Sequence, residues 1–308
     1  MAILVDQSTR VLCQGITGMA GTFHTHRMMQ YGTRVVAGVS PGKGGKSHID
    51  VPVFDHVAEA MQETRANASV VLVPADHAGA AMIEAIEAEM PLVVVVTERV
   101  PVLDMVRVRE ALKGSRTRLV GPNSQGVLAP EICQIGVMAT GGARPGRVGV
   151  VSRSASLTSE VVNQLTTKGL GQSTTVGIGG DPVHGIGFVD CLKLFFEDPE
   201  THGVVLIGET GGDEEQAAAE YLRTSGMRKP VVALIAGRHA PMRRRMGHAG
   251  TLMSRDRGDA SSKIVALESA GAMIAGSAHL VGATMHSALS GKPMTRSEPA
   301  SGRRQAVT

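Results

Sequence analysis

The sequence is poor in aromatic side chains. Its 308 residues include five Phe, two Tyr and no Trp. Proteins that bind single-stranded nucleic acid commonly stack bases on aromatic side chains, and this chain has few to offer. The charge is nearly balanced, with 31 Lys and Arg against 28 Asp and Glu, and 27 of each sign remain when the last 18 residues are left out. We therefore expect no nucleic-acid partner.

Cysteine is scarce as well. Cys13, Cys133 and Cys191 are widely separated, and none belongs to a CxxC pair. This spacing argues against a disulfide framework and a zinc site, so we expect no metal site and a reducing, cytoplasmic location. The start of the chain, MAILVDQSTR, lacks the features of a signal peptide. The longest strongly apolar run, residues 92–96, is far too short to span a membrane.

What the chain does contain is an alternation of short apolar runs and amphipathic stretches. The runs are rich in Val, Ile and Leu, which is typical of strands buried on both faces of a parallel sheet. We expect strands at residues 11–14, 34–39, 69–74, 92–97 and 117–120, and helices at 21–30, 57–66, 78–89 and 103–113. This repeat predicts a doubly wound α/β domain over residues 1–125.

A second α/β domain is expected at residues 146–290. Its strands are predicted at 147–152, 173–177, 203–208, 231–236 and 273–275, and its helices at 156–168, 188–196, 214–224, 261–269 and 278–289. Residues 126–145, which include the turn-rich stretch GGARPG, would be a link and one edge. The polar tail at 291–308, with two prolines and paired arginines, is predicted to be disordered.

A glycine-rich loop, GITGMAG at residues 15–21, follows the first predicted strand. Such a loop lets a phosphate approach the N-terminus of the next helix, although a plain strand–helix turn is the alternative. The second strand ends without the Asp or Glu of an ordinary NAD site, and is followed by PGKGGK. Lys43 among these glycines favours a phosphorylated ribose, as in coenzyme A or NADP, over a solvated loop charge.

Another loop of the first domain, residues 96–101, contains Glu98. This carboxylate would accept a hydrogen bond from an adenine amino group or a ribose hydroxyl, or it would cap the helix that follows. The sequence leaves both interpretations open.

Polar loops also follow the strands of the second domain. SRSASLT, at residues 152–158, joins a strand to a helix, where hydroxyl and free N–H groups form an anion site. N-capping by Ser154 is an alternative that does not exclude such a site. Glycine-rich loops follow at residues 177–182, 207–212 and 245–250.

Two of these loops carry a candidate catalytic pair. His248 differs from most of the eleven histidines because small residues bracket it and no apolar periodicity surrounds it. A neutral imidazole nitrogen is a nucleophile near neutral pH. A carboxylate on the other ring nitrogen would fix the tautomer and stabilise the charged product, and Glu209 is the candidate for that role.

Taken together, these loops resemble the α subunit of succinyl-CoA synthetase. The resemblance runs from about residue 3 to about residue 289 and rests on CQGITG, GTFH, YGT, PGKGG, PVF, LDM, GPN, VSRS, GQST, VGIGGDP, KPVV, IAG and RMGHAG, in that order. It extends to the wider group of NDP-forming acyl-CoA ligases, which includes malate–CoA ligase. The resemblance implies a Rossmann-like CoA-binding domain followed by a flavodoxin-like domain of the succinyl-CoA synthetase type.

The resemblance also implies roles for individual residues. His248 would be the phosphorylated histidine, and Glu209 would hydrogen-bond to it. Ser154 and Ala155 would hold the phosphate. The residues implied to bind coenzyme A are Thr17, Gly18, Met19, Ala20, Lys43, Val96, Thr97 and Glu98.

A partner chain is implied as well. In the family, an ATP-grasp β subunit supplies the site for ATP or GTP with Mg²⁺, and no ATP-grasp signature appears in this sequence. We therefore expect an αβ or α2β2 assembly that joins a small carboxylic acid to coenzyme A, as in the tricarboxylic acid cycle. We expect no membrane partner.

The chain departs from the succinate enzyme in segments expected near the acid. GPNCPG becomes GPNSQG, so Asn123, Ser124 and Gln125 are candidate substrate residues, and SRSGTLTYE becomes SRSASLTSE, which places Ser159 where the family has tyrosine. In the first loop, Met19 and Ala20 replace the usual Ser-Gln. The additional amide of Gln125 would favour malate or a sulfonated acid over succinate, unless this position is simply tolerant.

Two other functions stay open at this point. A non-catalytic, regulatory CoA-binding subunit would keep the loops, but the presence of both His248 and Glu209 argues against it. An NADP-dependent oxidoreductase shares the α/β class, but gives the His248 loop no role. The ligase interpretation accounts for all of the loops.

Overall fold

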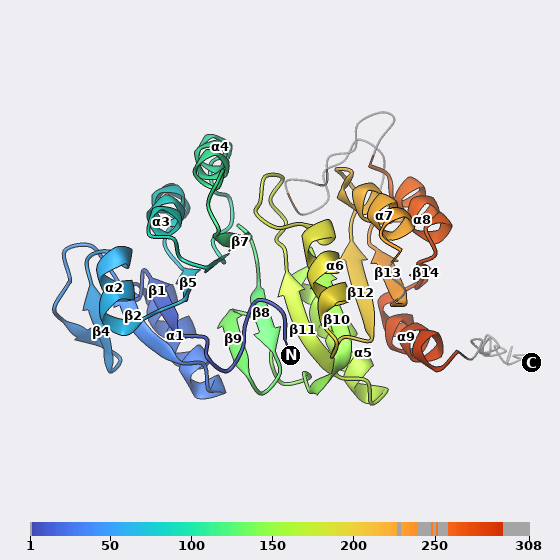
Figure 1. Ribbon diagram of the computed structural model, residues 1–308, viewed down its shortest axis with the longest axis horizontal. Helices are drawn as coiled ribbons and strands as arrows, with labels where there is room; N and C mark the ends of the chain where they lie inside the picture. Colours follow the sequence, from blue (N-terminus) through green and yellow to red (C-terminus); the bar gives the residue numbers. More distant parts are fainter. Residues whose placement is uncertain (1, 227–228, 239–247, 249–250, 252–257, 292–308) are drawn as a thin grey trace, which may run out of the picture.

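The computed structural model describes residues 2–226, 229–238, 248, 251 and 258–291. Apart from residue 291, the tail predicted to be disordered lies outside these residues, as do residues 245–247 and 249–250 of the histidine loop. Within the described part, two α/β domains lie side by side, with the N-terminus between them (Figure 1).

The first domain is built on one largely parallel sheet. Its strands are β1 (Val11–Gln14), β2 (Val35–Val39), β3 (Ser47–His48), β4 (Val51–Phe54), β5 (Ala68–Val71), β6 (Leu92–Val95) and β7 (Arg118–Val120). They lie in the order β3-β4-β2-β1-β5-β6-β7, and β3 runs antiparallel to β4. From β4 to β7 this is the strand order of Rossmann dinucleotide-binding folds, so the predicted class of the first domain is confirmed.

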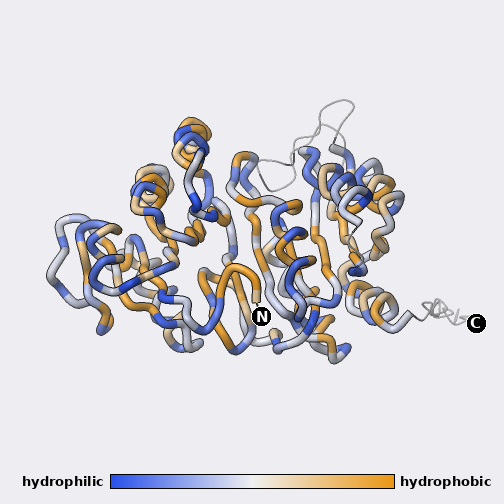
Figure 2. Tube along the Cα trace, in the orientation of Figure 1, coloured by the Kyte–Doolittle hydropathy of each residue, from blue (hydrophilic) through white to orange (hydrophobic). Residues whose placement is uncertain are grey.

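Helices cover both faces of this sheet because its strands are apolar on both sides. One face packs against α2 (Val57–Thr64), α3 (Ala75–Glu87) and α4 (Val102–Ala111). The other face packs against α1 (Met19–Tyr31). Figure 2 shows apolar residues along the strands and mixed hydropathy along the helices, as expected for helices with one face in contact with a sheet.

The second domain has a sheet of flavodoxin-like order. Its strands are β8 (Gly126–Ala129), β9 (Cys133–Gly136), β10 (Pro145–Ser152), β11 (Gln172–Gly177), β12 (Gly203–Gly208), β13 (Val231–Ile235) and β14 (Met273–Ile274). The order is β14-β13-β12-β10-β11-β8-β9, and the strands from β14 to β11 are parallel. The implied flavodoxin-like class is therefore confirmed.

Helices again pack on both faces of this sheet. One face contacts α5 (Ala155–Thr167) and α9 (Val281–Ser290), which follows the short 3₁₀ helix η2 (Ala278–Leu280). The other face contacts α6 (Phe188–Glu197), α7 (Glu214–Thr224) and α8 (Ala260–Ser269). None of the helices in the described ranges has the length and apolarity that crossing a bilayer requires.

The segment expected to be a link and an edge holds the two domains together. Its strands β8 and β9 form an antiparallel hairpin that extends the second sheet from β11. The same hairpin contacts α1 and β6 of the first domain, and the Thr33 hydroxyl donates to the backbone oxygen of Gln134 in β9 at 2.8 Å. Residues 126–136 therefore belong to the second sheet and pack on the first.

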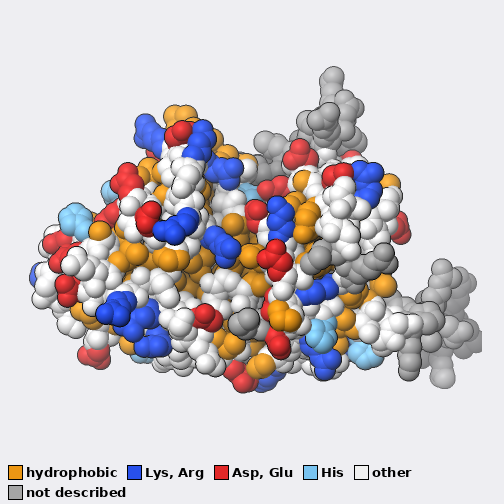
Figure 3. Space-filling view, viewed as in Figure 1, with side chains coloured by type: hydrophobic (Ala, Val, Ile, Leu, Met, Phe, Trp, Pro, Cys, Tyr) orange, Lys and Arg blue, Asp and Glu red, His pale blue; other side chains and the backbone are white. Residues whose placement is uncertain are grey.

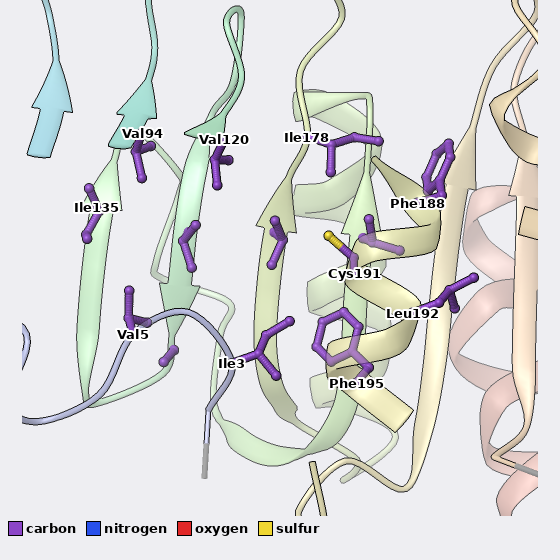
Figure 4. Packing of buried hydrophobic residues seen from close by; sticks show 14 of the residues in the cluster. Ile3, Val5, Val94, Val120, Ile135, Ile178, Phe188, Cys191, Leu192 and Phe195 are labelled. Carbon is purple, nitrogen blue, oxygen red and sulfur yellow. The ribbon is translucent and has the colours of Figure 1, made fainter. Parts of the chain in front are cut away.

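The chain's first residues add to this contact. The backbone N–H of Ile3 donates to the Thr174 hydroxyl in β11 at 3.0 Å. In Figure 4, Val5 lies beside Ile135 of β9 and Ile3 lies beside Phe195 of α6, and all four belong to one apolar cluster. One continuous apolar cluster thus spans both domains. On the surface, Figure 3 shows Lys and Arg interspersed with Asp and Glu across the visible face.

Candidate active site

A cavity lies where the carboxyl ends of strands from both sheets meet. It has a volume of about 250 Å³. It is lined by Val96, Glu98, Asn123, Ser124, Gln125, Val137, Ser152, Arg153, Ala155, Gly177, Gly179 and His248. In the second sheet, the loops after β10 and β12 flank the point where the strand order reverses. Ligands of open parallel sheets bind at such points.

The structure brings His248 and Glu209 together. His248 Nδ1 lies 2.8 Å from Glu209 Oε2 and 3.1 Å from Oε1. The hydrogen bond to Glu209 raises the pKa of the imidazole above its ordinary value, although burial acts in the opposite direction. The bond assigns Nδ1 to the carboxylate, which leaves Nε2 as the ring nitrogen available for chemistry.

Gly180 makes room for this imidazole. A Cβ atom at Gly180 would lie 2.5 Å from His248 Cγ, too close for any side chain while the ring holds its position. The glycine in the GGDP loop is therefore a steric requirement of the histidine site. Asp181, next in sequence, is buried, and its carboxylate accepts a hydrogen bond from the Asn123 amide at 3.0 Å. Burial raises the pKa of Asp181, and the bond from Asn123 opposes that rise.

Arg153 lies between two carboxylates beneath the histidine. Its side chain is 6% exposed; Nε is 3.4 Å from Glu209 Oε1, and Nη1 is 3.4 Å from Glu214 Oε2. These contacts are long, and within the described residues Nε has no hydrogen-bond partner. A buried guanidinium on the wall of a cavity, with an unsatisfied N–H, favours an anionic ligand.

Glu214 continues this charged network to a second histidine. His184 Nε2 lies 2.8 Å from Glu214 Oε1, and the His184 side chain is 5% exposed. Burial alone would raise the pKa of Glu214, but the hydrogen bond and charge of His184, together with Arg153 and Lys263, hold it below its ordinary value. Glu214 is thus a half-buried anion that shares Arg153 with Glu209.

The N-terminus of α5 opens beside this network. Ser154 is the N-cap, and its hydroxyl accepts from the backbone N–H of Leu157 at 3.4 Å. Ala155 lines the cavity. Positive partial charge at a helix N-terminus attracts anions, so the capping and anion-site interpretations of Ser154 are compatible. Ser159 lies on the exposed side of α5, where its hydroxyl donates to the backbone oxygen of Ala155 at 3.4 Å, and Ser159 itself does not line the cavity.

The segment Asn123–Gln125 lines the cavity, but its polar groups have partners in the protein. The Ser124 hydroxyl donates to the backbone oxygen of Gly177 and accepts from the N–H of Gly126 at 2.8 Å. The Gln125 amide nitrogen donates to the Thr158 hydroxyl at 2.7 Å. The amide expected to select a hydroxylated acid is therefore already engaged as a donor.

In the first domain, the loop at the N-terminus of α1 is open. Lys43 Nζ donates to the Thr17 hydroxyl at 2.9 Å, and Met19 is 91% exposed. Gly18 is the N-cap and supplies no side-chain cap, so nothing from that residue covers the N–H groups of Met19 and Ala20. Gly21 allows the helix to pack on the loop, because a Cβ there would lie 2.0 Å from the backbone oxygen of Gly15.

The loop after β6 divides its residues between two roles. Val96 and Glu98 line the cavity, whereas the Thr97 hydroxyl donates to the backbone oxygen of Val73 at 2.7 Å and holds the loop in place. Helix α4 begins after Pro101 and has no side-chain cap, so Glu98 does not cap it. Glu98 therefore lines the cavity instead of capping α4.

Sequence reasoning did not assign several charged residues of this region. Arg153 stands in the SRSAS loop after a predicted strand, and Glu214 and Glu215 open the predicted helix that follows GETGG, so these positions were the available signal. His184 gave no signal, because the sequence does not show its pairing with Glu214. Lys263 did give one, since it occupies a core-facing position of a predicted helix.

Comparisons with known proteins agree with this arrangement. The family profile of the CoA-binding domain matches residues 6–99, and that of CoA-ligase matches residues 151–273. Succinate–CoA ligase (ADP-forming) subunit alpha of Staphylococcus aureus is 50% identical over 285 residues, which cover 92% of this chain and 94% of that protein. The protein of the same name from Staphylococcus epidermidis matches to the same extent.

Solved structures share the fold at lower identity. ATP citrate lyase from Methanothrix soehngenii, in complex with citrate and coenzyme A, matches 96% of this chain with a TM-score of 0.82 and 24% identity. The dinucleotide-forming acetyl-coenzyme A synthetase 1 of Ca. Korarchaeum cryptofilum matches 88% with a TM-score of 0.70 and 19% identity. This chain spans 53% and 58% of those two chains.

A CoA-binding Rossmann-like domain joined to a CoA-ligase domain, with a histidine–carboxylate pair at their shared cavity, defines an acid–thiol ligase of the CoA-ligase class. The chain belongs to the family of succinate–CoA ligase alpha subunits, as its 50% identity over 92% of its length establishes. The resemblance drawn from the sequence and the expected enzyme class are thereby confirmed.

Proposed function

We propose that this chain is the α subunit of an enzyme that makes an acyl-CoA from a small dicarboxylic acid, coenzyme A and ATP or GTP, through a phosphohistidine and an acyl phosphate. The observation that carries the proposal is the 2.8 Å contact between His248 Nδ1 and Glu209 at the wall of the cavity. A ring nitrogen held in this way directs the other, Nε2, to act as a nucleophile.

The first chemical step uses this pair. The Nε2 lone pair forms a bond to the γ-phosphorus of the nucleotide, the bond to the bridging oxygen breaks, and the nucleoside diphosphate leaves. The Nδ1 proton stays in the hydrogen bond to Glu209, so the carboxylate balances the positive charge that develops on the ring. In this proposal an ATP-grasp β subunit, in an αβ or α2β2 assembly, supplies the nucleotide site and Mg²⁺.

The second step transfers the phosphoryl group to the acid. A carboxylate oxygen of the acid bonds to phosphorus, and the Nε2–P bond breaks to return the imidazole. The N-terminus of α5 at Ser154 and Ala155, together with the guanidinium of Arg153 on the cavity wall, supplies donors and positive charge for the phosphoryl oxygens. Donors fixed before the reaction need no rearrangement during it.

The residues of the first domain fit coenzyme A, whose thiol displaces phosphate from the acyl phosphate. The open N-terminus of α1 at Gly18–Ala20 and the cation of Lys43, hydrogen-bonded to Thr17, suit its phosphates. Glu98 and Val96 extend this surface to the cavity. The three cysteines are buried and free, as a reducing cytoplasm would keep them.

For the acid we propose succinate before malate. The Gln125 amide nitrogen, which gave the reason to favour a hydroxylated or sulfonated acid, donates to Thr158. A panel of succinate, malate and a sulfonated acid, with thioester formation as the readout, tests this order. A sulfonated acid or malate with a clearly higher kcat/KM than succinate would overturn it.

The phosphohistidine is tested by labelling. The chain and its β partner are incubated with ATP labelled on the γ-phosphate, and acid-labile label on the chain is measured. We expect label on the wild type and none on His248→Asn. His26→Asn, which alters an exposed histidine of α1, serves as the control. Equal labelling of His248→Asn would end the proposal, and unlabelled wild type would favour a regulatory CoA-binding subunit.

A further inference from the structure

A lysine lies fully buried beneath the candidate site. Lys263, on α8, has 0% of its side chain exposed and shares the core-facing side of the helix with Ala260, Ile264 and Leu267. Helix α8 packs on α7, β13 and β14. Lysine is almost never fully buried unless its charge is paired, so this position has a specific set of partners.

The partners of Lys263 belong to the loop that carries Glu209. Its Nζ donates to the backbone oxygen of Glu209 at 2.8 Å, to the backbone oxygen of Gly211, and to Glu215 Oε2. These three acceptors match the three N–H donors of an ammonium group. Two of the three are backbone groups of the loop after β12, so the lysine fixes the course of that loop.

Glu215 completes the arrangement from α7. Its side chain is also 0% exposed, and its Oε1 accepts from the backbone N–H of Glu209 at 3.0 Å. The backbone N–H and C=O of Glu209 are therefore both held by one buried ion pair. We call Lys263 and Glu215 the backbone clamp.

Apolar side chains could fill the space of this buried ion pair, so packing alone does not explain the clamp. Removing two charges from water is costly, and apolar residues of similar volume often stabilise a fold as well or better. Its polar contacts concentrate on Glu209, whose carboxylate must meet His248 Nδ1. A fixed backbone at Glu209 keeps that carboxylate from turning wholly toward Arg153, the other cation within reach.

We propose that Lys263 and Glu215 are positioning residues that hold Glu209 in place against His248. This inference rests on the proposed function of His248 as the phosphoryl carrier. What it adds is that the second layer of the site, on α7 and α8, sets the geometry of the histidine–carboxylate pair. The donors of Lys263 matter in this role, and the charges of the pair matter less.

Two variants separate the donors from the charges. Glu215→Gln conserves every contact: the amide oxygen accepts from Glu209 N–H, and an uncharged Lys263 amine donates to the two carbonyls and accepts from the new amide. The double variant Lys263→Met, Glu215→Gln removes the buried charges and also the donors to Glu209 and Gly211. We expect Glu215→Gln to label within a few-fold of the wild type. We expect the double variant to fold and to label about 10²-fold more slowly, the effect of displacing a catalytic group by about 1 Å.

A spectroscopic readout excludes a merely structural role. The imidazole of His248 is titrated by NMR in ¹⁵N-histidine-labelled chain and assigned with His248→Asn. Glu209, Arg153 and Asp181 are the charged groups that act on His248, and neither variant alters them. We expect the titration midpoint in the double variant to fall toward that of an ordinary histidine, because the carboxylate has moved away, while Glu215→Gln stays near the wild type.

The matched control is an exposed lysine–glutamate pair. Lys113 and Glu110 form an ion pair with side chains 73% and 71% exposed, so Lys113→Met, Glu110→Gln should change neither readout. If the double variant at the clamp does not fold, Glu215→Ala is used in its place. This variant leaves the Glu209 N–H without its acceptor, and it should show the same slower labelling and the same fall in the His248 titration midpoint. A folded variant with wild-type labelling and an unchanged His248 midpoint overturns the clamp. Wild type that takes no label refutes the proposed function instead, and the His248 titration still decides the clamp.

Discussion

The loops at the carboxyl ends of the two sheets differ in how their charges are held. In the first domain, Lys43 and Met19 are exposed, and Lys43 reaches one hydroxyl, that of Thr17. In the second, Arg153 and Glu209 are buried and interlinked, with Lys263 and Glu215 beneath them. A ligand that arrives and leaves whole is served by an open loop, whereas transfer of a group between atoms needs charges fixed beforehand.

The largest effect on the reaction should come from a change in the buried charges of the second domain. Glu209→Gln keeps the shape of the side chain but removes the charge that balances the imidazolium, so we expect labelling of His248 to slow by about 10²-fold. The wild-type rate should fall as the pH drops through the raised pKa of His248, because protonation occupies Nε2. In the variant this decline should move to lower pH. Rates of label uptake between pH 5 and 9 measure both.

Glu220→Gln is the control for this substitution. It alters an exposed glutamate of α7, paired with Arg223, and should leave the profile where it is. A Glu209→Gln profile that coincides with the wild type would remove the distinction between the two loops.

A smaller effect, confined to the binding of coenzyme A, should come from a change in the exposed loop of the first domain. Lys43→Met removes a cation that we assign to a phosphate of coenzyme A, and loss of one charge-assisted hydrogen bond raises KM for coenzyme A about tenfold. Histidine labelling should not change, since no coenzyme A takes part in it. Steady-state kinetics measure KM, and Lys46→Met, in the same loop, is the control. Slower labelling in Lys43→Met would mean that the two loops are coupled.

The smallest effect concerns stability. Thr158→Val leaves the buried Gln125 amide nitrogen without its acceptor, and we expect a loss of about 1 kcal/mol in the free energy of unfolding. Thr167→Val, at the exposed end of the same helix, should change it less. Urea unfolding measures both. A marked change in acid preference in Thr158→Val would show that Gln125 takes part in selecting the acid substrate.

Much of the fold could be predicted because its strands are apolar on both faces. Predicted and observed ends agree within a few residues, and helix α7 coincides at 214–224. Strands β3 and β4 were not predicted, because β3 has only two residues and because Pro52 in β4 argues against a strand inside a sheet. The hairpin β8–β9 is buried by both domains, so it lacks the alternation that marks a half-exposed strand.

The candidate site was predictable where residues stand in loops after strands. The pairing of His248 with Glu209 was a candidate from the loop residues and was implied again by the resemblance, and the structure brings the two side chains together. Contacts such as Arg153 with Glu214, 61 positions apart, depend on which loops the sheet brings side by side. Burial of Lys263 follows from the same tertiary packing, so its place among apolar positions could raise the question of a partner but could not name one.

The apolar cluster that runs through both domains has a consequence for how such a chain can be divided. Hairpin β8–β9 and the segment at Ile3 and Val5 pack in an apolar cluster that includes residues of both domains. A cut at residue 125 would therefore remove part of the buried interior from each half. The two halves should therefore unfold together. Separate production of either half should give aggregation-prone material, and mixing the two should restore solubility only if that interior re-forms.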